Sequence, residues 1–443
     1  MDSDQQVKPS ARGINTLALS NLVGACILGI MFFVLDLIYG EQLFQISTKW
    51  SEQMFDSSAF LNGWFWFCSV PLYYAINFSL YPFVYYLKDK HRALKFLCWI
   101  LLHHVISETI KLIYKDSRPC FQSDLIGREN CSCSFGKFSG HSSGSMFFYL
   151  LVYSEIISHL KLSKWLKLSW LFVLIFIILN IGFSRIYIGA HSVNQVILGF
   201  LYGYVLFSVN LTFRDFFDLR FAALLNVETA KYQVKLIWFK VVIFALALVS
   251  NGLLVLFWAL AVNNYEGVKD ADISNSFCVR KCREKSQYLA NNHLDSGSFS
   301  YIVVGIFGLQ LLLPNSTLSI PNIYYYKSTW KNFKFVFCRL LVFLLVSLPV
   351  IGAFITATIY YGIWNHLIMI ALCLLYAGAL IHGLPRLLRS MQLAVSGDMF
   401  VDIDQEMGPV SPIELVNLSD KRLEIGTDRQ HDNLERFVNP SHN

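Results

Sequence analysis

Long apolar stretches recur along this chain and restrict the folds that it can adopt. We identify about ten stretches, each close to the roughly 20 mostly apolar residues that a helix needs to cross a bilayer. They lie at about 14–39, 61–86, 94–111, 145–160, 168–184, 191–213, 236–262, 301–319, 336–360 and 366–385. Charged residues make up only 15% of the chain, against about 25% in soluble domains. The sequence therefore predicts an all-α, polytopic transmembrane helix bundle of about ten spans.

This composition excludes a soluble enzyme, a disordered regulator and a disulfide-rich miniprotein. The net charge of +6 is small and spread over loops, so we expect no nucleic-acid partner. The first apolar stretch is too long for a cleavable signal peptide and should be a retained span. We expect a cytosolic N-terminus (1–13), a six-span core (14–213), four additional spans (214–386) with a cysteine-containing loop near 263–300, and a polar, disordered cytosolic tail (387–443).

Positive charge in the loops orients the predicted bundle. One set of loops and termini holds 18 Lys and Arg residues and the other set holds 12. Because cytosolic loops carry the excess of Lys and Arg, the first set should be cytosolic. Both termini then lie in the cytosol, while the loops near 112–144 and 263–300 face the lumen or the cell exterior. The endoplasmic reticulum and the plasma membrane fit this topology equally well.

The cysteines support the same orientation. Of ten cysteines, five lie outside the predicted spans, all of them in the two non-cytosolic loops. These are Cys120, Cys131, Cys133, Cys278 and Cys282. An oxidising compartment would allow disulfides within or between these loops, with one thiol left over. The alternative is a metal site at Cys278-x3-Cys282, and a sequon at Asn130 lies in the first of these loops.

The first of three polar segments begins at the end of the third predicted span. Lys111 lies at this end, and Arg118 follows seven residues later, directly before Pro119. A planar guanidinium and a compact ammonium group suit a phosphate group, although a Lys at a helix end also commonly extends to the membrane interface. Glu108 precedes Lys111 by three residues, so the two share a helix face and should pair.

The second and third segments add two histidines and another arginine. Ser139, Gly140 and His141 open the fourth span, whose N–H groups and positive dipole end favour an anion. Ser-Gly at a helix start is equally an ordinary cap. The third segment contains Arg185 and His191 between the fifth and sixth spans. All three segments fall on the non-cytosolic side, so their side chains could jointly bind a phosphoryl group, attack it and protonate the leaving oxygen.

In this order and spacing, residues 111–195 resemble the three signature motifs of the type 2 phosphatidic acid phosphatase/vanadium haloperoxidase superfamily. These motifs are K-x6-R-P, P-S-G-H and S-R-x5-H-x3-D. The resemblance implies a metal-independent phosphoric monoester hydrolase that needs no cofactor and works on the lumenal or extracellular side. It also implies that the first six spans form the phosphatase core.

The resemblance implies a role for each matching residue. His191 would attack phosphorus and form a phosphohistidine. His141 would protonate the leaving alkoxide and then activate water. The phosphate oxygens would be bound by Lys111, Arg118 and Arg185, with further hydrogen bonds from Ser139 and Gly140.

Two positions depart from the motifs. Phe138 replaces Pro, as happens in lipid phosphate phosphatases. Gln195 replaces the Asp that would orient the nucleophilic imidazole and stabilise its cation. Gln can accept a hydrogen bond from His191 but carries no charge. The glucose-6-phosphatase branch is similar in having Gln at this position.

These features leave the substrate open. The second motif most resembles lipid phosphate phosphatases, so a phosphorylated lipid such as phosphatidate or a sphingoid-base phosphate leads. The third motif and the extra spans are more similar to glucose-6-phosphatase, so a sugar phosphate is the alternative. A prenyl diphosphate is a further candidate. A non-catalytic protein that binds or transports a phosphorylated lipid is the alternative from another class, because Gln195 lacks the charge of the motif Asp.

Overall fold

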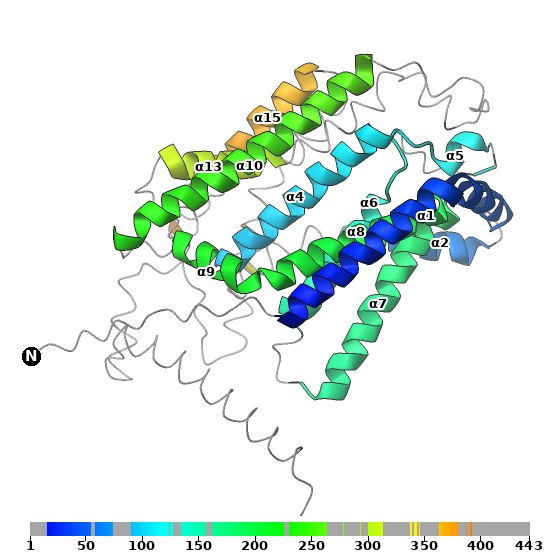
Figure 1. Ribbon diagram of the computed structural model, residues 1–443, viewed down its shortest axis with the longest axis horizontal. Helices are drawn as coiled ribbons and strands as arrows, with labels where there is room; N and C mark the ends of the chain where they lie inside the picture. The colour runs from blue at the N-terminus through cyan, green and yellow to red at the C-terminus, as the bar shows by residue number, and fades with distance from the viewer. Residues whose placement is uncertain are drawn as a thin grey trace, which may run out of the picture.

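The fold was analysed in a computed structural model (Figure 1). It describes residues 16–54, 58–73, 90–123, 125–126, 134–155, 157, 162–225, 230–263, 278, 293, 300–312, 337–338, 341–342, 345, 363–379, 387 and 390–391. The predicted cytosolic N-terminus, most of the loop near 263–300 and nearly all of the tail lie outside these residues. The same holds for most of the predicted span at 336–360.

Every regular element within the described ranges is helical, so the predicted all-α class is confirmed. The elements are α1 (Thr16–Met54), α2 (Ala59–Phe67), the π-helix η1 (Cys68–Leu72), α4 (Lys90–Tyr114), α5 (Pro119–Gln122), α6 (Gly140–Glu155), α7 (Lys164–Tyr187), α8 (Val193–Thr212), α9 (Arg214–Leu225), α10 (Ala230–Asn263), α13 (Tyr301–Leu312) and α15 (Ile363–Gly378). Among the residues that the structure describes, five segments are long and apolar enough to cross a membrane. They are Thr16–Met54, Leu94–Gln122, Lys164–Tyr187, Val193–Thr212 and Ile237–Val262. The total of ten spans stays a prediction.

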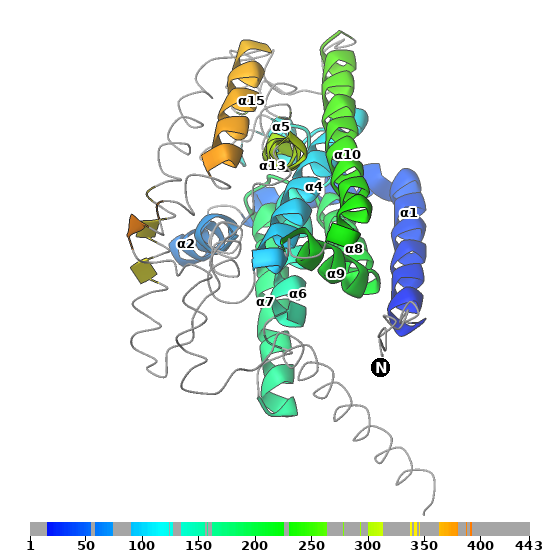
Figure 2. The ribbon, with the colours of Figure 1, turned by 90° about the vertical axis from the view of Figure 1, so that its left-hand side faces the viewer.

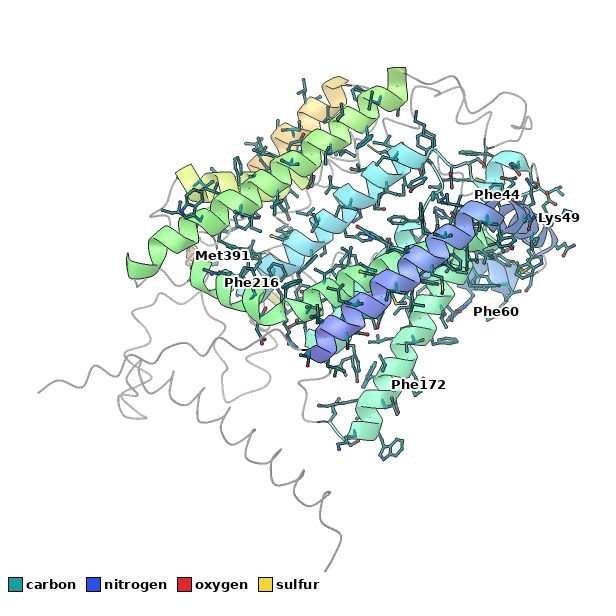
Figure 3. All side chains as sticks on the ribbon, in the orientation of Figure 1. Phe44, Lys49, Phe60, Phe172, Phe216 and Met391 are labelled. Carbon is teal, nitrogen blue, oxygen red and sulfur yellow. The ribbon has the colours of Figure 1, made fainter. Side chains whose placement is uncertain are left out.

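In Figure 1, α4 lies between two groups of helices, and Figure 2 shows the same helices from the side. One group contains α1, α6, α7 and α8, with α8 packed against both α1 and α6. In the other group, α10 packs against α4 and α13, and α13 packs against α15. Large apolar side chains remain exposed on the outer faces, as lipid contact requires. Phe172 on α7 is 64% exposed and lies clear of the neighbouring helices (Figure 3).

Helix α1 continues beyond the apolar stretch that predicts a span at about 14–39. Its 39 residues correspond to about 58 Å at 1.5 Å per residue, almost twice the roughly 30 Å hydrocarbon core. The additional turns bury one polar face, which contains Ser47, Thr48 and Ser51. Ser47 and Ser51 bond the corner between α7 and α8. The Ser51 hydroxyl donates to the Ile186 carbonyl at 2.6 Å, and the Ser47 hydroxyl accepts from the Val193 N–H at 2.9 Å. Loss of apolar periodicity therefore marked the end of the lipid-facing part of α1, not the end of the helix.

Close packing of α8 on α6 positions two of the polar segments together. Gly199 and Gly203 are separated by one turn of α8, in a small-xxx-small pattern that lets membrane helices approach closely. A Cβ atom at Gly199 would lie 2.6 Å from the Ser139 carbonyl oxygen, and one at Gly203 would collide with the Ser143 carbonyl oxygen. Only glycine fits at these positions, and the contact places the start of α6 beside the start of α8.

Candidate active site

The three polar segments converge at one end of the bundle. Lys111 lies in the last turn of α4, and Arg118 immediately precedes α5. Ser139, Gly140 and His141 surround the start of α6. Arg185 lies in the last turn of α7, His191 lies at the corner between α7 and α8, and Gln195 lies in the first turn of α8. Their side chains are buried, except that Gly140 and His141 are half-buried and mark the more accessible side of the site.

Hydrogen bonds fix both the orientation and the tautomer of His191. Its Nδ1 lies 2.8 Å from the Gly136 carbonyl oxygen and 3.3 Å from Oε1 of Gln195. Its Nε2 lies 3.1 Å from Nη1 of Arg118. A guanidinium only donates and a carbonyl only accepts, so this network assigns the proton to Nδ1 and the lone pair to Nε2. The unprotonated nitrogen of His191 therefore faces the arginine.

The surroundings of His191 favour its neutral form. Burial is the largest effect that holds its pKa well below the usual value, followed by the positive charges of Arg118 and Arg185. Lys111 and His141 act in the same direction, so all four groups lie within electrostatic range of the imidazole. A neutral imidazole among several cations has the charge distribution of an anion site that holds an available nucleophile.

Gln195 occupies the position of the motif Asp and contacts both sides of the site. Its Nε2 donates to the Ser117 carbonyl at 3.0 Å, which orients Oε1 toward His191. Oε1 also accepts from the Ser192 N–H at 3.3 Å. Its own backbone carbonyl accepts from the Ser139 N–H at 3.0 Å and links α8 to the second motif. The amide is thus held in the one orientation in which it accepts from the imidazole.

Arg118 is 2% exposed and is held by the segment at 134–135 and by the α7–α8 corner. Its Nε donates to the Ser134 carbonyl at 2.5 Å, and its Nη2 donates to the Ser134 hydroxyl at 2.6 Å and the Phe135 carbonyl at 3.1 Å. Its Nη1 donates to the Ala190 carbonyl at 2.7 Å and faces His191. The four bonds to residues 134, 135 and 190 position the guanidinium group of Arg118. The fifth contact is with His191, a residue of the third motif.

Lys111 pairs with Glu108, as predicted from their spacing. Its Nζ lies 2.6 Å from Oε1 of Glu108. The same ammonium group lies next to the second motif, because a Cβ atom at Gly140 would be only 3.5 Å from it. The first and second motifs therefore meet at Lys111 and Gly140.

Ser139 acts mainly as the cap of α6 in this structure. Its hydroxyl oxygen accepts from the Ser142 N–H at 3.3 Å and lies 2.8 Å from the Ser142 hydroxyl. Its backbone N–H is already bonded to Gln195. The expectation that Ser139 binds phosphate oxygens is therefore untested, and the observed bonds match the capping alternative.

The segment around η1 contacts the remaining two site residues, a role that the sequence did not reveal. The Tyr73 ring stacks on His141 with ring centroids 4.0 Å apart, and the Tyr73 hydroxyl lies 3.4 Å from the Gly140 carbonyl oxygen. Ser69 accepts a hydrogen bond from Nη1 of Arg185. Tyr73 and Ser69 both belong to the predicted span at 61–86. Neither residue is part of a recognisable motif, so nothing in the sequence assigns them to the site.

Asp36 on α1 is a second contributor that sequence reasoning missed. Its carboxylate lies 2.6 Å from Nζ of Lys137 and accepts from Nδ2 of Asn194 at 2.7 Å. Asn194 thus faces another helix. An aspartate within an apolar span could have been identified from its position alone, because intramembrane charges are rare and usually paired.

The loop cysteines answer one of the questions left by the sequence. Cys278 is in a disulfide, so the alternative metal site with Cys282 is wrong, and its partner lies outside the described residues. Cys120 is a free, buried thiol. Within the described ranges, no group of three His, Cys, Asp or Glu side chains is placed to hold a metal ion.

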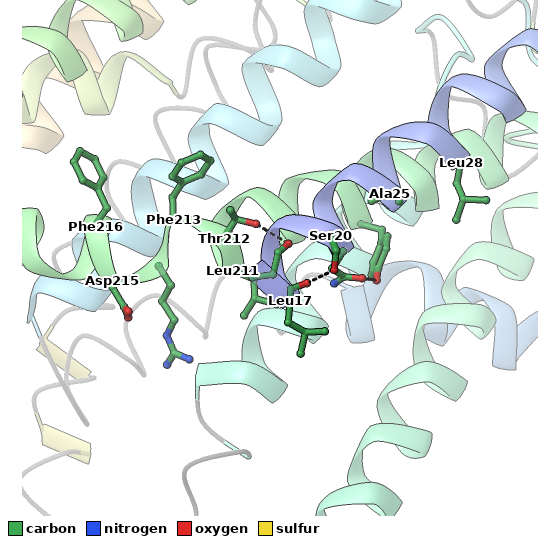
Figure 4. Close-up of a pocket in the computed structure, with 14 residues that line it drawn as sticks. Leu17, Ser20, Ala25, Leu28, Leu211, Thr212, Phe213, Asp215 and Phe216 are labelled. Atoms are coloured by element: carbon green, nitrogen blue, oxygen red, sulfur yellow. Dashed lines mark hydrogen bonds between the residues drawn. The ribbon is translucent and has the colours of Figure 1, made fainter. Parts of the chain in front are cut away.

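A hollow of about 800 Å³ lies at the opposite end of α8 from these motifs (Figure 4). It is lined by residues of α1, including Leu17 and Leu28, and by residues near the end of α8, including Tyr204 and Thr212. Helix α8 is about 30 Å long, and no motif residue lines this hollow. It is separate from the candidate active site.

The comparisons with known proteins agree with the motif resemblance. Residues 92–219 match the family model described as the PAP2 superfamily, and this range contains all three motifs. The chain is also similar to the phosphatidylglycerophosphatase B of Bacillus subtilis (strain 168), with 32% identity over 108 residues. That alignment covers 24% of this chain and 48% of the relative, so the chain spans about half the length of the curated relative that it matches. No solved structure matches the chain. The predicted family resemblance is confirmed over the matched residues.

Proposed function

We propose that this chain is an integral membrane phosphatase that hydrolyses lipid phosphate monoesters through a phosphohistidine on His191. The observation that carries the proposal is the geometry of His191. Its Nδ1 is bonded to the Gly136 carbonyl at 2.8 Å, so its lone pair lies on Nε2, 3.1 Å from the Arg118 guanidinium. A protein that only binds phosphate needs cations but does not need a neutral imidazole held in this tautomer.

In the proposed reaction, a substrate phosphoryl group approaches Nε2 of His191, and one of its oxygens accepts the hydrogen bond of Nη1 of Arg118 in place of Nε2, which frees the lone pair. Nε2 attacks phosphorus, and the bond from phosphorus to the ester oxygen breaks. His141 gives its proton to the leaving alkoxide. A bound phosphate dianion favours the protonated form of His141 that this step requires. Lys111, Arg118 and Arg185 stabilise the charge on the other phosphate oxygens.

The second step returns the enzyme to its starting state. His141 takes a proton from a water molecule, the water oxygen bonds to phosphorus, and the bond between phosphorus and His191 breaks. Inorganic phosphate leaves with its negative charge still balanced by the three cations. The Gly136 carbonyl and Gln195 hold the Nδ1 proton throughout, so His191 returns as the same neutral tautomer.

A lipid substrate is favoured by the comparison and by the surroundings of the site. The relative's name describes action on a phosphorylated glycerolipid. The site lies at the ends of apolar helices, where a lipid headgroup could reach it without leaving the bilayer. The Gln at position 195 keeps a sugar phosphate as the second candidate substrate class. We further propose that the site faces the lumen or the cell exterior, which fits the disulfide at Cys278.

Phosphate release by the detergent-purified protein tests this proposal. The substrates are phosphatidate, phosphatidylglycerol phosphate, sphingosine 1-phosphate, glucose 6-phosphate and a prenyl diphosphate, each with EDTA present. We expect release from a lipid monoester that is lost in His191→Ala. Preferential release from glucose 6-phosphate would assign the sugar phosphatase branch. Phosphate binding without any release would instead favour the non-catalytic alternative.

The covalent step has its own test. Wild-type protein mixed with a ³²P-labelled substrate and quenched in alkali should carry label that is stable to base and labile to acid. The protein-bound label should be absent from His191→Ala. It should also be absent when an excess of unlabelled substrate is added together with the labelled substrate. In His141→Ala, which lacks the proposed base for hydrolysis, the phosphohistidine should also be trapped if it forms. Turnover of substrate with no labelled protein in either the wild type or His141→Ala would contradict a phosphohistidine.

A further inference from the structure

We propose that His293 is a positioning residue of the phosphate site. It lies between α10 and α13, outside residues 92–219 that match the family model. It contacts two parts of the site at once, Glu108 and Phe135. This inference rests on the proposed function, because it assigns to His293 the alignment of groups that bind and attack phosphate.

The contacts of His293 define its role in the network. Its side chain is fully buried, and its ring is stacked on Phe135 with centroids 5.3 Å apart. The Phe135 N–H donates to Nε2 of His293 at 2.8 Å. Because Nε2 accepts that bond, the proton of the neutral ring lies on Nδ1, which is hydrogen-bonded to Oε2 of Glu108. His293 therefore accepts from one side of the site and donates to the other.

The bond to Glu108 determines the position of Lys111. Glu108 bonds His293 with one carboxylate oxygen and Lys111 with the other, the latter at 2.6 Å. With both oxygens engaged, the carboxylate is held in one plane and Lys111 is held beside Gly140. Loss of His293 would leave one oxygen of a buried carboxylate without this bond, and Glu108 would then turn or take up water.

The bond to Phe135 determines the positions of Arg118 and His191. The Phe135 carbonyl accepts from Arg118 at 3.1 Å, and the next carbonyl, of Gly136, accepts from His191 at 2.8 Å. Both carbonyls belong to a short irregular segment that the ring of His293 packs against. A shift of this segment would therefore move the proposed nucleophile and a phosphate-binding cation together.

An apolar contact also links the additional membrane region, predicted at 214–386, to the site. Cys278, which precedes His293 in the chain, is buried with Phe135, Phe121 and Leu254 of α10. Cys278 is also in a disulfide. The additional membrane region thus completes the support of a site whose motif residues all lie in the first half of the chain.

Three single variants at His293 and Ser300 test the proposal, together with Glu108→Gln alone and combined with His293→Ala. His293→Ala removes both hydrogen bonds, while His293→Gln keeps one acceptor and one donor. Ser300→Ala is the matched control. It removes a buried 2.6 Å hydrogen bond to Asn251 in the same additional membrane region, and it does not touch the site. The measurements are kcat and KM on the best ester, the affinity for inorganic phosphate, and the yield of folded protein.

For His293→Ala we expect kcat/KM to fall by about 10- to 100-fold, because small displacements of reacting groups carry penalties of this size. Affinity for inorganic phosphate should fall with it, whereas Ser300→Ala should match the wild type in both. We expect His293→Gln to recover most of the rate. The double variant Glu108→Gln/His293→Ala should lose no more than the worse single variant, since both residues act through one network.

Wild-type kinetics and phosphate affinity in His293→Ala would overturn the proposal. So would equal losses in His293→Ala and Ser300→Ala, because a general weakening of the fold would then explain both. If the wild type releases no phosphate from any ester, the proposed phosphatase function fails. Weaker inorganic phosphate binding by His293→Ala than by Ser300→Ala would still support the positioning role in that case.

Discussion

The carbonyl oxygen of Gly136 lies 2.8 Å from Nδ1 of His191, closer than Oε1 of Gln195 at 3.3 Å. A backbone carbonyl therefore makes the shorter of the two bonds that orient the imidazole. In triads of this kind a carboxylate usually holds the second nitrogen and stabilises the cation that forms. Here a peptide dipole and an amide share the orienting task, which explains how a neutral residue at position 195 is compatible with an oriented histidine.

Replacing Gly136 by alanine should disturb this arrangement. A Cβ atom at this position would lie 2.5 Å from the Ser117 carbonyl oxygen and 2.6 Å from Nε2 of Gln195. Both atoms are held by hydrogen bonds, so the segment that carries the Gly136 carbonyl must move instead. We expect kcat to fall by about 10- to 100-fold, measured as phosphate release. Gly252→Ala on α10 is the matched control, since a Cβ there meets nothing within 4 Å. Equal activity of the two variants would show that the Gly136 carbonyl does not orient His191.

Removing the Gln195 side chain should have a smaller effect than removing His191, the proposed nucleophile. In Gln195→Ala the closer bond to Gly136 remains, so the tautomer of His191 is retained. We expect kcat to fall by about tenfold with little change in KM, compared with losses of about 10⁴-fold where an orienting carboxylate is the main partner. His191→Ala, assayed in parallel, should be inactive. A Gln195→Ala variant as inactive as His191→Ala would make Gln195 the principal orienting residue.

The side chains of this site could be predicted from sequence, but much of their support could not. Motif spacing identified His191 and Arg118 because the chemistry resides in their side chains. Gly136 and Phe135 act through backbone atoms, which leave no residue-type signal. His293 lies 185 residues from Glu108 in the sequence, and only the folded chain brings the two together. The all-α class could be predicted from the length of the apolar stretches. The polar C-terminal part of α1 could not, because its serines are buried by packing against other helices although they are not hydrophobic.

The depressed pKa of His191 predicts how activity depends on pH. Burial first, and then the charges of Arg118 and Arg185, hold this pKa well below its usual value near 6.5. The imidazole therefore stays neutral and nucleophilic in the free enzyme at pH values where an exposed histidine is protonated. We expect the acid limb of kcat/KM assigned to His191 to lie below pH 6.5.

A charge-removing variant checks the cause of that shift. Arg185→Gln removes one of the cations that lower the pKa of His191, so the acid limb of its residual activity should move to higher pH. Folding stability should follow the same linkage. Below pH 6.5 the unfolded chain binds a proton at His191 that the folded chain does not, so this contribution to stability is present above pH 6.5 and is lost as the pH falls. An acid limb that is unmoved in Arg185→Gln would assign it to another group.

The buried ion pair between Asp36 and Lys137 should stabilise the contact of α1 with the active-site segment. The two charged groups lie 2.6 Å apart, and both side chains are at least nine-tenths buried. Although burial acts against the charged form of Lys137, the hydrogen bond to Asp36 and the charge of Asp116 raise its pKa overall. With the lysine pKa raised in the folded state, this stabilisation is present at neutral pH and is lost only as the pH rises through that value.

Breaking this pair from one side should therefore cost more than removing it completely. Asp36→Leu leaves a buried ammonium group without its closest partner, a change that costs about 3 kcal/mol or more in buried pairs. The double variant Asp36→Leu/Lys137→Leu removes both charges, so we expect its midpoint of thermal denaturation in detergent to lie above that of Asp36→Leu alone. Because Lys137 directly follows Gly136, Asp36→Leu should also lower kcat, whereas Asn251→Ala, which removes a hydrogen bond within α10, should not. Additive losses in the double variant would mean that Asp36 and Lys137 stabilise the protein independently, and α1 would then have no special connection to the site.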